Sequence, residues 1–304
     1  MGEHQNIQWF PGHMAKTRRA IAESLALVDA VVEIIDARIP SSSRNPVLAD
    51  IIKQKPRIIV LNKSDIADPA ATDEWIKLYE SLGDSAVAVD CKSGSGIKQF
   101  GACVNRVLGH KVELNRQRGV NKALRLMVVG IPNVGNSSFI NRLADKRAKV
   151  EDRPGVTRGN QWFSTKDNFL LLDTPGVLWP KFDDPIVGER LAFTGAVKDT
   201  VLDIEELATG LLDTLCDDYQ NLIKERRTAA ELTRQVCSPG GTTLAGLTAF
   251  ELLCKIGAKR GMLMRGGETN TERAAVMILD EFRAGKIGRI TLERPIMATD
   301  DDCI

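Results

Sequence analysis

Short apolar runs recur through the first 180 positions, and each ends in polar residues or glycine. Runs rich in β-branched residues are typical of parallel strands that helices cover on both faces. The expected strands are Val31–Ile35, Arg57–Leu61, Ala86–Asp90, Leu126–Val129 and Phe169–Leu172. The pattern therefore predicts an α/β domain with a mostly parallel sheet and helices on both faces.

The apolar positions after residue 180 recur at helical spacing instead. The expected helices are Ile204–Cys216, Tyr219–Val236, Thr248–Met264 and Thr271–Ala284. Thr269 and Glu272 have the spacing of a capping box for the last helix, and Gly285 is placed to end it. We therefore expect two domains, an α/β domain over residues 1–180 and a small all-α domain over 181–304.

Composition limits the class of protein. A chain of 304 residues with 43% hydrophobic content can bury a full core, and its formal charge of +1 gives no global basic field. Lysine and arginine gather between residues 106 and 149, and carboxylates gather between 167 and 218. The six cysteines form no C-x-x-C pair, and no apolar run reaches membrane length. These features predict a soluble cytoplasmic protein with reduced thiols and no membrane partner.

The stretch Arg125–Phe139 reads RLMVVGIPNVGNSSF, which predicts a strand, a glycine loop and a helix start. The spacing of Gly130, Gly135 and Ser137 fits the phosphate-loop motif G-x-x-x-x-G-K-S, whose backbone N–H groups surround phosphate oxygens. Asn136 stands where the motif has lysine. The loop residues expected to bind the nucleotide are Asn133, Val134, Gly135, Asn136, Ser137 and Ser138.

The second expected strand runs into Asn62, Lys63, Ser64 and Asp65, an N-K-x-D sequence. The Asp65 carboxylate can accept two hydrogen bonds from guanine, from N1–H and the exocyclic amine, and adenine has no such donor pair. Asn62 can hold the loop, and the stem of Lys63 can lie along the base. These four residues therefore predict a guanine site. After the third strand, the backbone amides from Cys91 to Gly94 are candidates to close over the base.

The last expected strand ends in Asp173, Thr174, Pro175 and Gly176, a D-x-x-G sequence. Such a carboxylate reaches Mg²⁺ through water, and the glycine amide contacts the terminal phosphate. Thr157 lies in the polar stretch before this strand and can supply a hydroxyl to the same ion. The expected magnesium ligands are Ser137, Thr157 and Asp173.

Two stretches have alternative interpretations. Asp36 and Arg38 follow the first strand, where they would either face a ligand or form a local ion pair. The basic connector after residue 110 is either a solvated linker or an RNA contact.

The order of the motifs indicates a circular permutation, because Asn62–Asp65 precedes the phosphate loop whereas GTPases usually place N-K-x-D last. Permutation preserves a sheet when neighbouring termini are joined and a surface loop is opened. The chain then leaves the nucleotide domain just after Gly176, so the helical domain is coupled to the nucleotide state.

These motifs, with WFPGHMAK near the N-terminus, DARIP from Asp36, GIPNVG and PGVTR, resemble the ribosome biogenesis GTPase A (RbgA/YlqF) family over nearly the whole chain. The resemblance implies a circularly permuted Ras-like GTPase with a C-terminal helical domain. It implies the cofactors GTP, GDP and Mg²⁺. It also implies a role in late maturation of the large ribosomal subunit, with its precursor, rRNA and ribosomal proteins as partners. We expect the chain to act as a monomer.

The resemblance also implies residue roles. Val177 stands where Ras-like enzymes often carry the glutamine that orients water, and the family uses a hydrophobic residue there. The histidine of its WFPGHM segment is a proposed catalytic group, which gives His13; an unperturbed imidazole titrates near pH ~6.5 and can orient or deprotonate water. Asn133 matches an asparagine that coordinates K⁺ in related GTPases, which adds potassium as a possible cofactor.

Asn136 stands in place of the motif's lysine, and unlike Val177 it departs from the family's sequence as well as from the general motif. A neutral amide replaces a full positive charge, so nucleotide binding and hydrolysis are both expected to weaken. Two functions therefore remain open: a GTP-hydrolysing assembly factor, or a nucleotide-deficient rRNA-binding scaffold that keeps the GTPase fold. The cations of the helical domain are either a solvated face or a phosphate contact surface, and they are Lys255, Lys259, Arg260, Arg265, Arg283, Lys286 and Arg289.

Overall fold

The computed structural model describes residues 14–144, 161–179, 182, 184–197, 199, 202–225 and 247–295. These residues fall into two compact units. The sheet unit contains the described residues between Gln8 and Lys181 together with those from Glu293 onward. The helical unit contains the described residues of Phe182–Leu292. No helix in these ranges is long and apolar enough to cross a bilayer.

The sheet unit is built on a six-stranded sheet of order β3-β2-β1-β4-β6-β5. Its strands are β1 Ala30–Asp36, β2 Arg57–Asn62, β3 Ser85–Val89, β4 Leu124–Gly130, β5 Gln161–Ser164 and β6 Phe169–Asp173. Neighbouring strands are parallel except for β5, which runs antiparallel to β6. The mostly parallel sheet confirms the predicted fold class. The edge strand β5 was not predicted, because four residues carry little periodicity.

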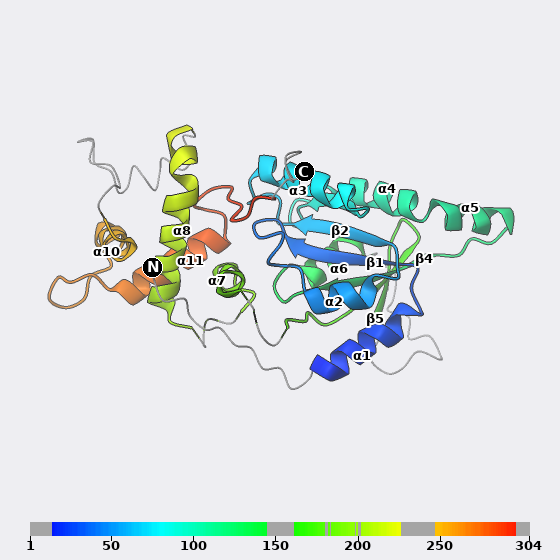
Figure 1. Cartoon of the computed structure of the whole chain (residues 1–304), viewed down its shortest axis with the longest axis horizontal. Coiled ribbons are helices and arrows are strands. Elements are labelled where there is room, and N and C mark those ends of the chain that lie inside the picture. Colours follow the sequence, from blue (N-terminus) through cyan, green and yellow to red (C-terminus); the bar gives the residue numbers. More distant parts are fainter. Residues whose placement is uncertain are drawn as a thin grey trace, which may run out of the picture. The chain divides into compact units, whose positions relative to one another are not determined.

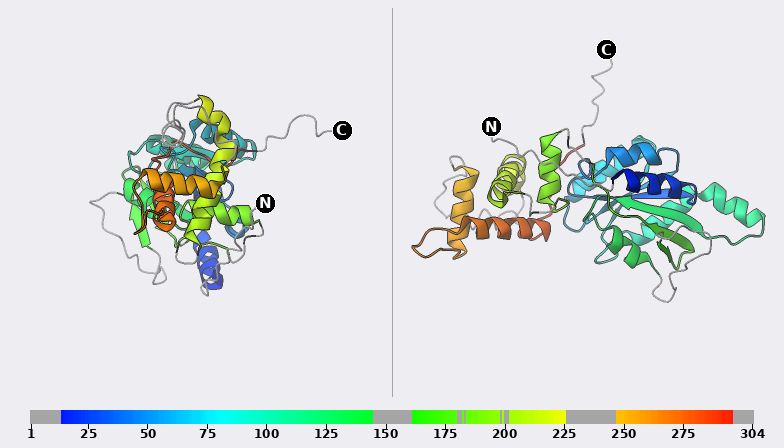
Figure 2. Two further views of the ribbon diagram at one scale, coloured as in Figure 1. Left: turned by 90° about the vertical axis from the view of Figure 1, so that its left-hand side faces the viewer. Right: turned by 90° about the horizontal axis from the view of Figure 1, so that it is seen from below.

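Helices cover both faces of this sheet (Figure 1). They are α1 Met14–Leu25, α2 Pro46–Ile52, α3 Pro69–Ser81, α4 Ile97–Val107, α5 Gly109–Gln117 and α6 Asn136–Leu143. Figure 2 (right) shows α1 and α2 on one side of the sheet and α6 on the other. Ile21 and Leu48 pack with Val31 and Met127 in the core on the first side. On α4 and α6, Phe100 and Phe139 meet edge to face, with ring centroids 4.9 Å apart.

The strand register brings the predicted motifs to one edge of the sheet. Asp36 at the end of β1 pairs with Asn62 at the end of β2, and Ile34 pairs with Gly130 at the end of β4. Asp173 at the end of β6 pairs with Val128 of β4. The loops after these four parallel strands therefore start from the same edge, the usual ligand position in open α/β sheets.

The helical unit contains α7 Pro185–Phe193, α8 Ile204–Glu225, α10 Ala249–Lys259 and α11 Thr271–Arg283. One continuous α8 covers the predicted helix end at Cys216 and the predicted new start at Tyr219. The prediction of a break was wrong, since Asp217 and Asp218 cost at most about 0.7 kcal/mol each inside a helix. The rest of the predicted helix to Val236 lies outside the described residues.

The predicted capping box for α11 was also wrong. Asn270 is the N-cap, and its side chain accepts a hydrogen bond from the Arg273 backbone N–H. Thr269 instead forms an isolated β-bridge with Leu263. A capping box does exist one helix earlier, where Thr248 caps α10 with Glu251.

The chain returns to the sheet unit at Glu293, which sequence reasoning did not predict. The Glu293 carboxylate is 5% exposed and accepts hydrogen bonds from the backbone N–H groups of Ser41 (2.6 Å) and Ser42 (3.1 Å) and from the Ser42 hydroxyl. The Trp75 indole N–H donates to the Glu293 carbonyl oxygen over 3.0 Å. Arg294 pairs with Asp68 over 3.1 Å. These contacts fix the returning chain to α3 and to the loop after β1.

Candidate nucleotide site

The phosphate loop joins β4 to α6. Asn133 has φ +63° and Gly135 has φ +106°, so both lie in the left-handed region. Alternation of such residues with right-handed ones turns successive N–H groups toward one point, which suits an anion. Gly135 has no room for a side chain, because a Cβ there would lie 2.3 Å from Nδ2 of Asn62. The sequence therefore forms the predicted loop despite the change at Asn136.

Asn62 and Lys63 hold this loop from the neighbouring strand. Nδ2 of Asn62 donates to the carbonyl oxygen of Val134 over 2.7 Å, and Nζ of Lys63 donates to the carbonyl oxygen of Asn133 over 2.7 Å. The two predicted motifs are far apart in the sequence, yet direct hydrogen bonds join them. The structure thus places a candidate base-recognition segment beside a candidate phosphate-binding loop.

Asp65 follows this contact and is half-buried. No hydrogen bond or ion pair engages its carboxylate within the part of the chain that the structure describes, so both oxygens can accept from a ligand. The neighbouring Ser64 N–H donates to the carbonyl oxygen of Val89 at the end of β3, over 3.2 Å. This bond holds the guanine-binding candidate against the third strand.

The turn after β3 is arranged by Asp90. Its carboxylate accepts the backbone N–H groups of Lys92 (2.7 Å) and Ser93 (3.0 Å). The Gly94 N–H donates to the Asp90 carbonyl oxygen over 2.8 Å, so three of the four amides expected to close over a base are already bound. Cys91 follows Asp90 in the chain. Burial raises the pKa of its thiol to about 12, and the negative charge of Asp90 adds to this rise. Arg142 of α6 donates to the Ser93 carbonyl oxygen and links this turn to the helix after the phosphate loop.

A buried charge cluster lies below the loop. Arg38 and Asp36 are each 1% exposed and form an ion pair in which Oδ2 of Asp36 lies 2.7 Å from the guanidinium, and Nζ of Lys63 lies 2.8 Å from the same oxygen. Burial alone would raise the pKa of Asp36, but the charges of Arg38 and Lys63 outweigh it and hold that pKa well below its ordinary value. Of the two interpretations of Asp36 and Arg38, the structure contains the ion pair. Its role is to fix Lys63, which in turn holds the phosphate loop.

The D-x-x-G segment approaches the loop from β6. A Cβ on Gly176 would lie 2.9 Å from the backbone nitrogen of Pro132, so glycine is required for this contact. The Val177 N–H donates to the Gly130 carbonyl oxygen over 3.1 Å. The Val177 side chain is 5% exposed and packs with Ile21 and Leu48 in the core. The residue that replaces the usual glutamine is thus a packing residue.

Asn136 begins α6, and its side-chain oxygen is buried without a hydrogen-bond partner among the described residues. This oxygen lies against Gly130, since a Cβ on that glycine would stand 2.6 Å from it. Oδ1 of Asn62, whose amide nitrogen donates to Val134, is a second buried oxygen without a hydrogen-bond partner in the described part of the chain. A buried acceptor without a donor costs about 1–3 kcal/mol. The protein therefore leaves polar groups at the loop that a ligand or a cationic side chain would satisfy.

The predicted magnesium ligands are placed only in part. Ser137 is exposed in the first turn of α6, and Asp173 ends β6 half-buried. Burial raises the pKa of Asp173, opposed by the backbone N–H of Thr174. A hydroxyl and a carboxylate are hard oxygen donors of the kind Mg²⁺ prefers, and a cation would favour the charged carboxylate. Thr157 and the catalytic candidate His13 lie outside the described residues.

One contributor to the site was missed. Asn45 is buried, caps α2, and donates from Nδ2 to the Val177 carbonyl oxygen over 2.8 Å. The signal in the sequence was Asn45 followed by Pro46, a common helix start. That signal indicates the cap but not the distant carbonyl.

Comparison with known proteins agrees with this arrangement. The family model described as 50S ribosome-binding GTPase matches residues 125–237. The Ribosome biogenesis GTPase A of Priestia megaterium is 46% identical over 292 residues, which cover 95% of this chain and 97% of the relative. The protein of the same name from Bacillus cereus is 43% identical over 95% of this chain and 94% of the relative. Mitochondrial ribosome-associated GTPase 1 of Mus musculus is 32% identical and covers 97% and 92%.

Solved structures support the same conclusion. The chain is similar to GDP-bound YlqF with a TM-score of 0.63 at 26% identity, over 91% of this chain and 99% of that one. It is similar to GNP-bound YlqF from T. maritima with a TM-score of 0.59 at 28% identity, over 92% and 99%. The permuted motif order and the hydrogen bonds between the two motifs agree with these relatives. The chain belongs to the ribosome biogenesis GTPase A family of circularly permuted GTP-hydrolysing enzymes.

Proposed function

We propose that this chain binds GTP and GDP at the edge formed by β1, β2, β4 and β6, and acts in assembly of the large ribosomal subunit. The observation that carries the proposal is the pair of hydrogen bonds from Asn62 and Lys63 to the phosphate loop. They join the phosphate loop to the segment that carries Asp65, the carboxylate to which we assign guanine selection. The ribosomal role rests on the names of the relatives, including the mitochondrial ones.

Each predicted site residue has a proposed role. Asp65 would select guanine, with Asn62, Lys63 and Ser64 holding its loop. The residues from Asn133 to Ser138 would surround the phosphates, and Gly176 would contact the terminal one. Mg²⁺ would be held by Ser137, Thr157 and Asp173, and would neutralise charge on the terminal phosphates. K⁺ at Asn133 is a further proposal from the resemblance.

The attacking water needs a polar group to orient it. Val177 has a buried apolar side chain and takes no part in this step. We assign the step to His13, whose imidazole can accept a proton from water when the N-terminal arm is docked. This assignment rests on the WFPGHM segment that the chain has in common with its family.

Asn136 is expected to slow this enzyme rather than change its reaction. The amide brings no positive charge to the terminal phosphates, and a lost transition-state donor costs about 100-fold to 1000-fold in rate. A charged hydrogen bond in the ground state is worth about 1.5–3 kcal/mol, so affinity also falls. If binding is lost altogether, the second function remains: an rRNA-binding scaffold with the GTPase fold.

Titration of a fluorescent GDP and of a non-hydrolysable GTP analogue, with Mg²⁺ and K⁺ present, tests the proposal. We compare the protein with Asn136→Lys, and use Asn136→Gln as the control that lengthens the amide without adding charge. Guanine-selective binding by the unmodified protein, with hydrolysis recovered by lysine but not glutamine, is the expected result. Absence of binding and hydrolysis in all three forms would contradict the nucleotide function and leave the scaffold.

A further inference from the structure

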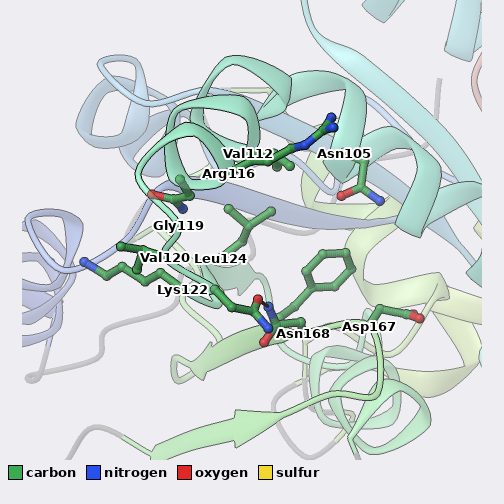
Figure 3. A pocket seen from close by; sticks show the side chains of 12 residues that line it. Asn105, Val112, Arg116, Gly119, Val120, Lys122, Leu124, Asp167 and Asn168 are labelled. Carbon is green, nitrogen blue, oxygen red and sulfur yellow. Dashed lines mark hydrogen bonds between the residues drawn. The ribbon is translucent and has the colours of Figure 1, made fainter.

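A hollow of about 380 Å³ lies in the sheet unit at the edge away from the phosphate loop (Figure 3). Leu124 and Phe169, the first residues of β4 and β6, belong to its lining. The phosphate loop follows the other end of β4, roughly 20 Å away at about 3.3 Å per residue. The hollow is therefore separate from the nucleotide site.

The helix α5 forms one wall of this hollow, and none of its residues is buried. In Figure 1 it extends away from the body of the sheet unit. A short helix with no buried face gains little from packing, which is what normally stabilises helices in proteins. Val112 and Val120, beside the hollow, are large apolar residues that remain 40% and 49% exposed. This wall has the properties of a surface that contacts a partner.

The charge of this wall is strongly positive. The segment from residue 109 to 122 carries Lys111, Arg116, Arg118 and Lys122 against a single carboxylate, Glu113. Lys111 is paired with Asp29, and Arg116 reaches Glu113 only at 3.8 Å while remaining 83% exposed. No ion pair involves Arg118 or Lys122 within the described ranges. Among the residues that line the hollow itself, Arg116 and Lys122 carry positive charge and Asp167 carries negative charge, so the lining favours an anion.

Side-chain amides give the hollow its second property. Four asparagines line it: Asn105, Asn115, Asn121 and Asn168. Nδ2 of Asn168 donates to Oδ1 of Asn121 over 3.0 Å, which leaves the NH₂ group of Asn121 as a donor and the oxygen of Asn168 as an acceptor. In Figure 3 the Asn168 side chain lies between those of Lys122 and Asp167, whose charged ends point away from it on opposite sides. A neighbouring donor and acceptor match the edge of a nucleobase, which also presents both.

We propose that this hollow binds an unpaired nucleotide of RNA, with Arg116 and Lys122 on the phosphates and the Asn121–Asn168 pair on the base edge. An acidic peptide would need the cations but not the Asn121–Asn168 pair of amides. Unpaired RNA bases can leave the stack and enter such a hollow, whereas the base edges of a regular RNA helix are poorly accessible. The proposal rests on the ribosomal role given above, and it assigns an RNA contact to the GTPase domain rather than to the helical one.

Fluorescence anisotropy with a labelled unstructured RNA of about 12 nucleotides tests this proposal. The double variant Arg116→Glu/Lys122→Glu is compared with Lys53→Glu/Lys77→Glu, which makes the same charge change at two exposed positions, one just after α2 and one on α3. We expect the first variant to lose about 10-fold or more in affinity. The slope of the logarithm of the binding constant against the logarithm of the salt concentration should fall in magnitude by about 1.4, because each single-stranded phosphate contact contributes about 0.7. Equal losses in the two variants would overturn the site.

The amide contact is tested with Asn121→Ala and an abasic RNA of the same length. The variant should weaken binding of the normal RNA and leave binding of the abasic RNA unchanged. Competition by free nucleoside monophosphates as effective as that by RNA would overturn the RNA assignment. A charge variant that binds RNA normally but ribosomal particles poorly would overturn it in favour of a protein partner.

Far-UV circular dichroism and thermal unfolding serve as the folding control in every variant, and fluorescent GDP binding is a second control, because none of these residues lies at the nucleotide site. Failure of the proposed function itself would appear differently, as an unmodified protein that binds neither guanine nucleotide nor ribosomal particles. Loss of RNA binding with intact GDP binding therefore reports on the hollow alone.

Discussion

The side-chain amide of Asn45 donates a hydrogen bond to the carbonyl oxygen of Val177 over 2.8 Å. The oxygen of the same side chain accepts from the backbone N–H of Val47, over 2.9 Å, at the start of α2. Val177 in turn donates its own N–H to Gly130. One asparagine thus connects a helix start, the segment after D-x-x-G and the strand that carries the phosphate loop.

We expect Asn45→Ser to lower the free energy of unfolding by about 1 kcal/mol, because serine retains the cap but is too short to reach Val177. Asn45→Ala should lower it by a further ~1 kcal/mol through loss of the cap. Urea unfolding followed by circular dichroism measures both values. Equal stability of the serine variant and the unmodified protein would mean that the Val177 bond contributes nothing.

Removal of the Asp36 carboxylate should destabilise the sheet unit strongly. Asp36→Asn leaves Arg38 buried without its counter-ion, a change that costs about 3–5 kcal/mol. The folded pKa of Asp36 lies below its unfolded value of about 3.9. Its stabilisation is therefore present above that pH and is lost as the pH falls toward the folded pKa.

Urea unfolding at neutral pH and at the lowest pH where the protein stays folded checks this expectation. The gap in stability between the unmodified protein and Asp36→Asn should narrow in acid. A gap that is constant with pH would show that the carboxylate does not carry the effect. Glu23→Gln is the matched control, since Glu23 pairs with Arg19 at an exposed site and contributes little.

Gly176→Ala should separate the D-x-x-G turn from the phosphate loop. The new Cβ would lie 2.9 Å from the Pro132 nitrogen and 3.1 Å from the Ile131 carbonyl carbon, both backbone atoms that have to move. Such overpacking costs about 1–3 kcal/mol. We expect the variant to lose more affinity for the GTP analogue than for GDP, because the Gly176 amide is expected to contact the terminal phosphate, which GDP lacks. Titration of both nucleotides measures the two losses. Gly109→Ala, where nothing lies within 4 Å, should bind like the unmodified protein.

The attachment of the returning chain is tested at Glu293. Glu293→Gln keeps the size of the side chain but removes the charge that accepts three hydrogen bonds around Ser41 and Ser42, so we expect a loss of about 1.5–3 kcal/mol. Glu74→Gln is the control, because its ion pair with Arg294 is 3.4 Å long and half exposed. Similar unfolding curves for both variants would contradict the importance of the buried carboxylate.

The sequence predicted correctly that the motifs of the candidate site follow buried parallel strands and so lie at one edge of the sheet. The glycines of the phosphate loop, Asn62–Asp65 and Asp173–Gly176 all lie where a parallel sheet places its ligands. Contacts between distant segments could not be predicted in the same way. The cluster of Asp36, Arg38 and Lys63 depends on strand register, and no local pattern distinguishes a buried arginine from a solvated one.

The helical unit was harder to predict for a related reason. Arg283 was one of several cations with two interpretations, and the structure pairs it with Asp199 at 2.7 Å and with the carbonyl oxygens of Ala192 and Phe193. It holds α11 to the end of α7 and is not part of a free basic surface. Helix ends were also mistaken, since caps such as Thr248 and Asn270 are local choices among several similar polar residues.

The return of the chain at Glu293 makes the helical unit an insertion, joined to the sheet unit at both of its ends. A segment held at one end can explore every orientation that its linker allows, whereas a second anchor closes it into a ring and removes most of those orientations. Removal of the residues after Leu292 would therefore keep the described helices α7, α8, α10 and α11 but leave the helical unit attached to the sheet unit at one end only. In this protein, Glu293 and Arg294 provide the second attachment of the helical unit.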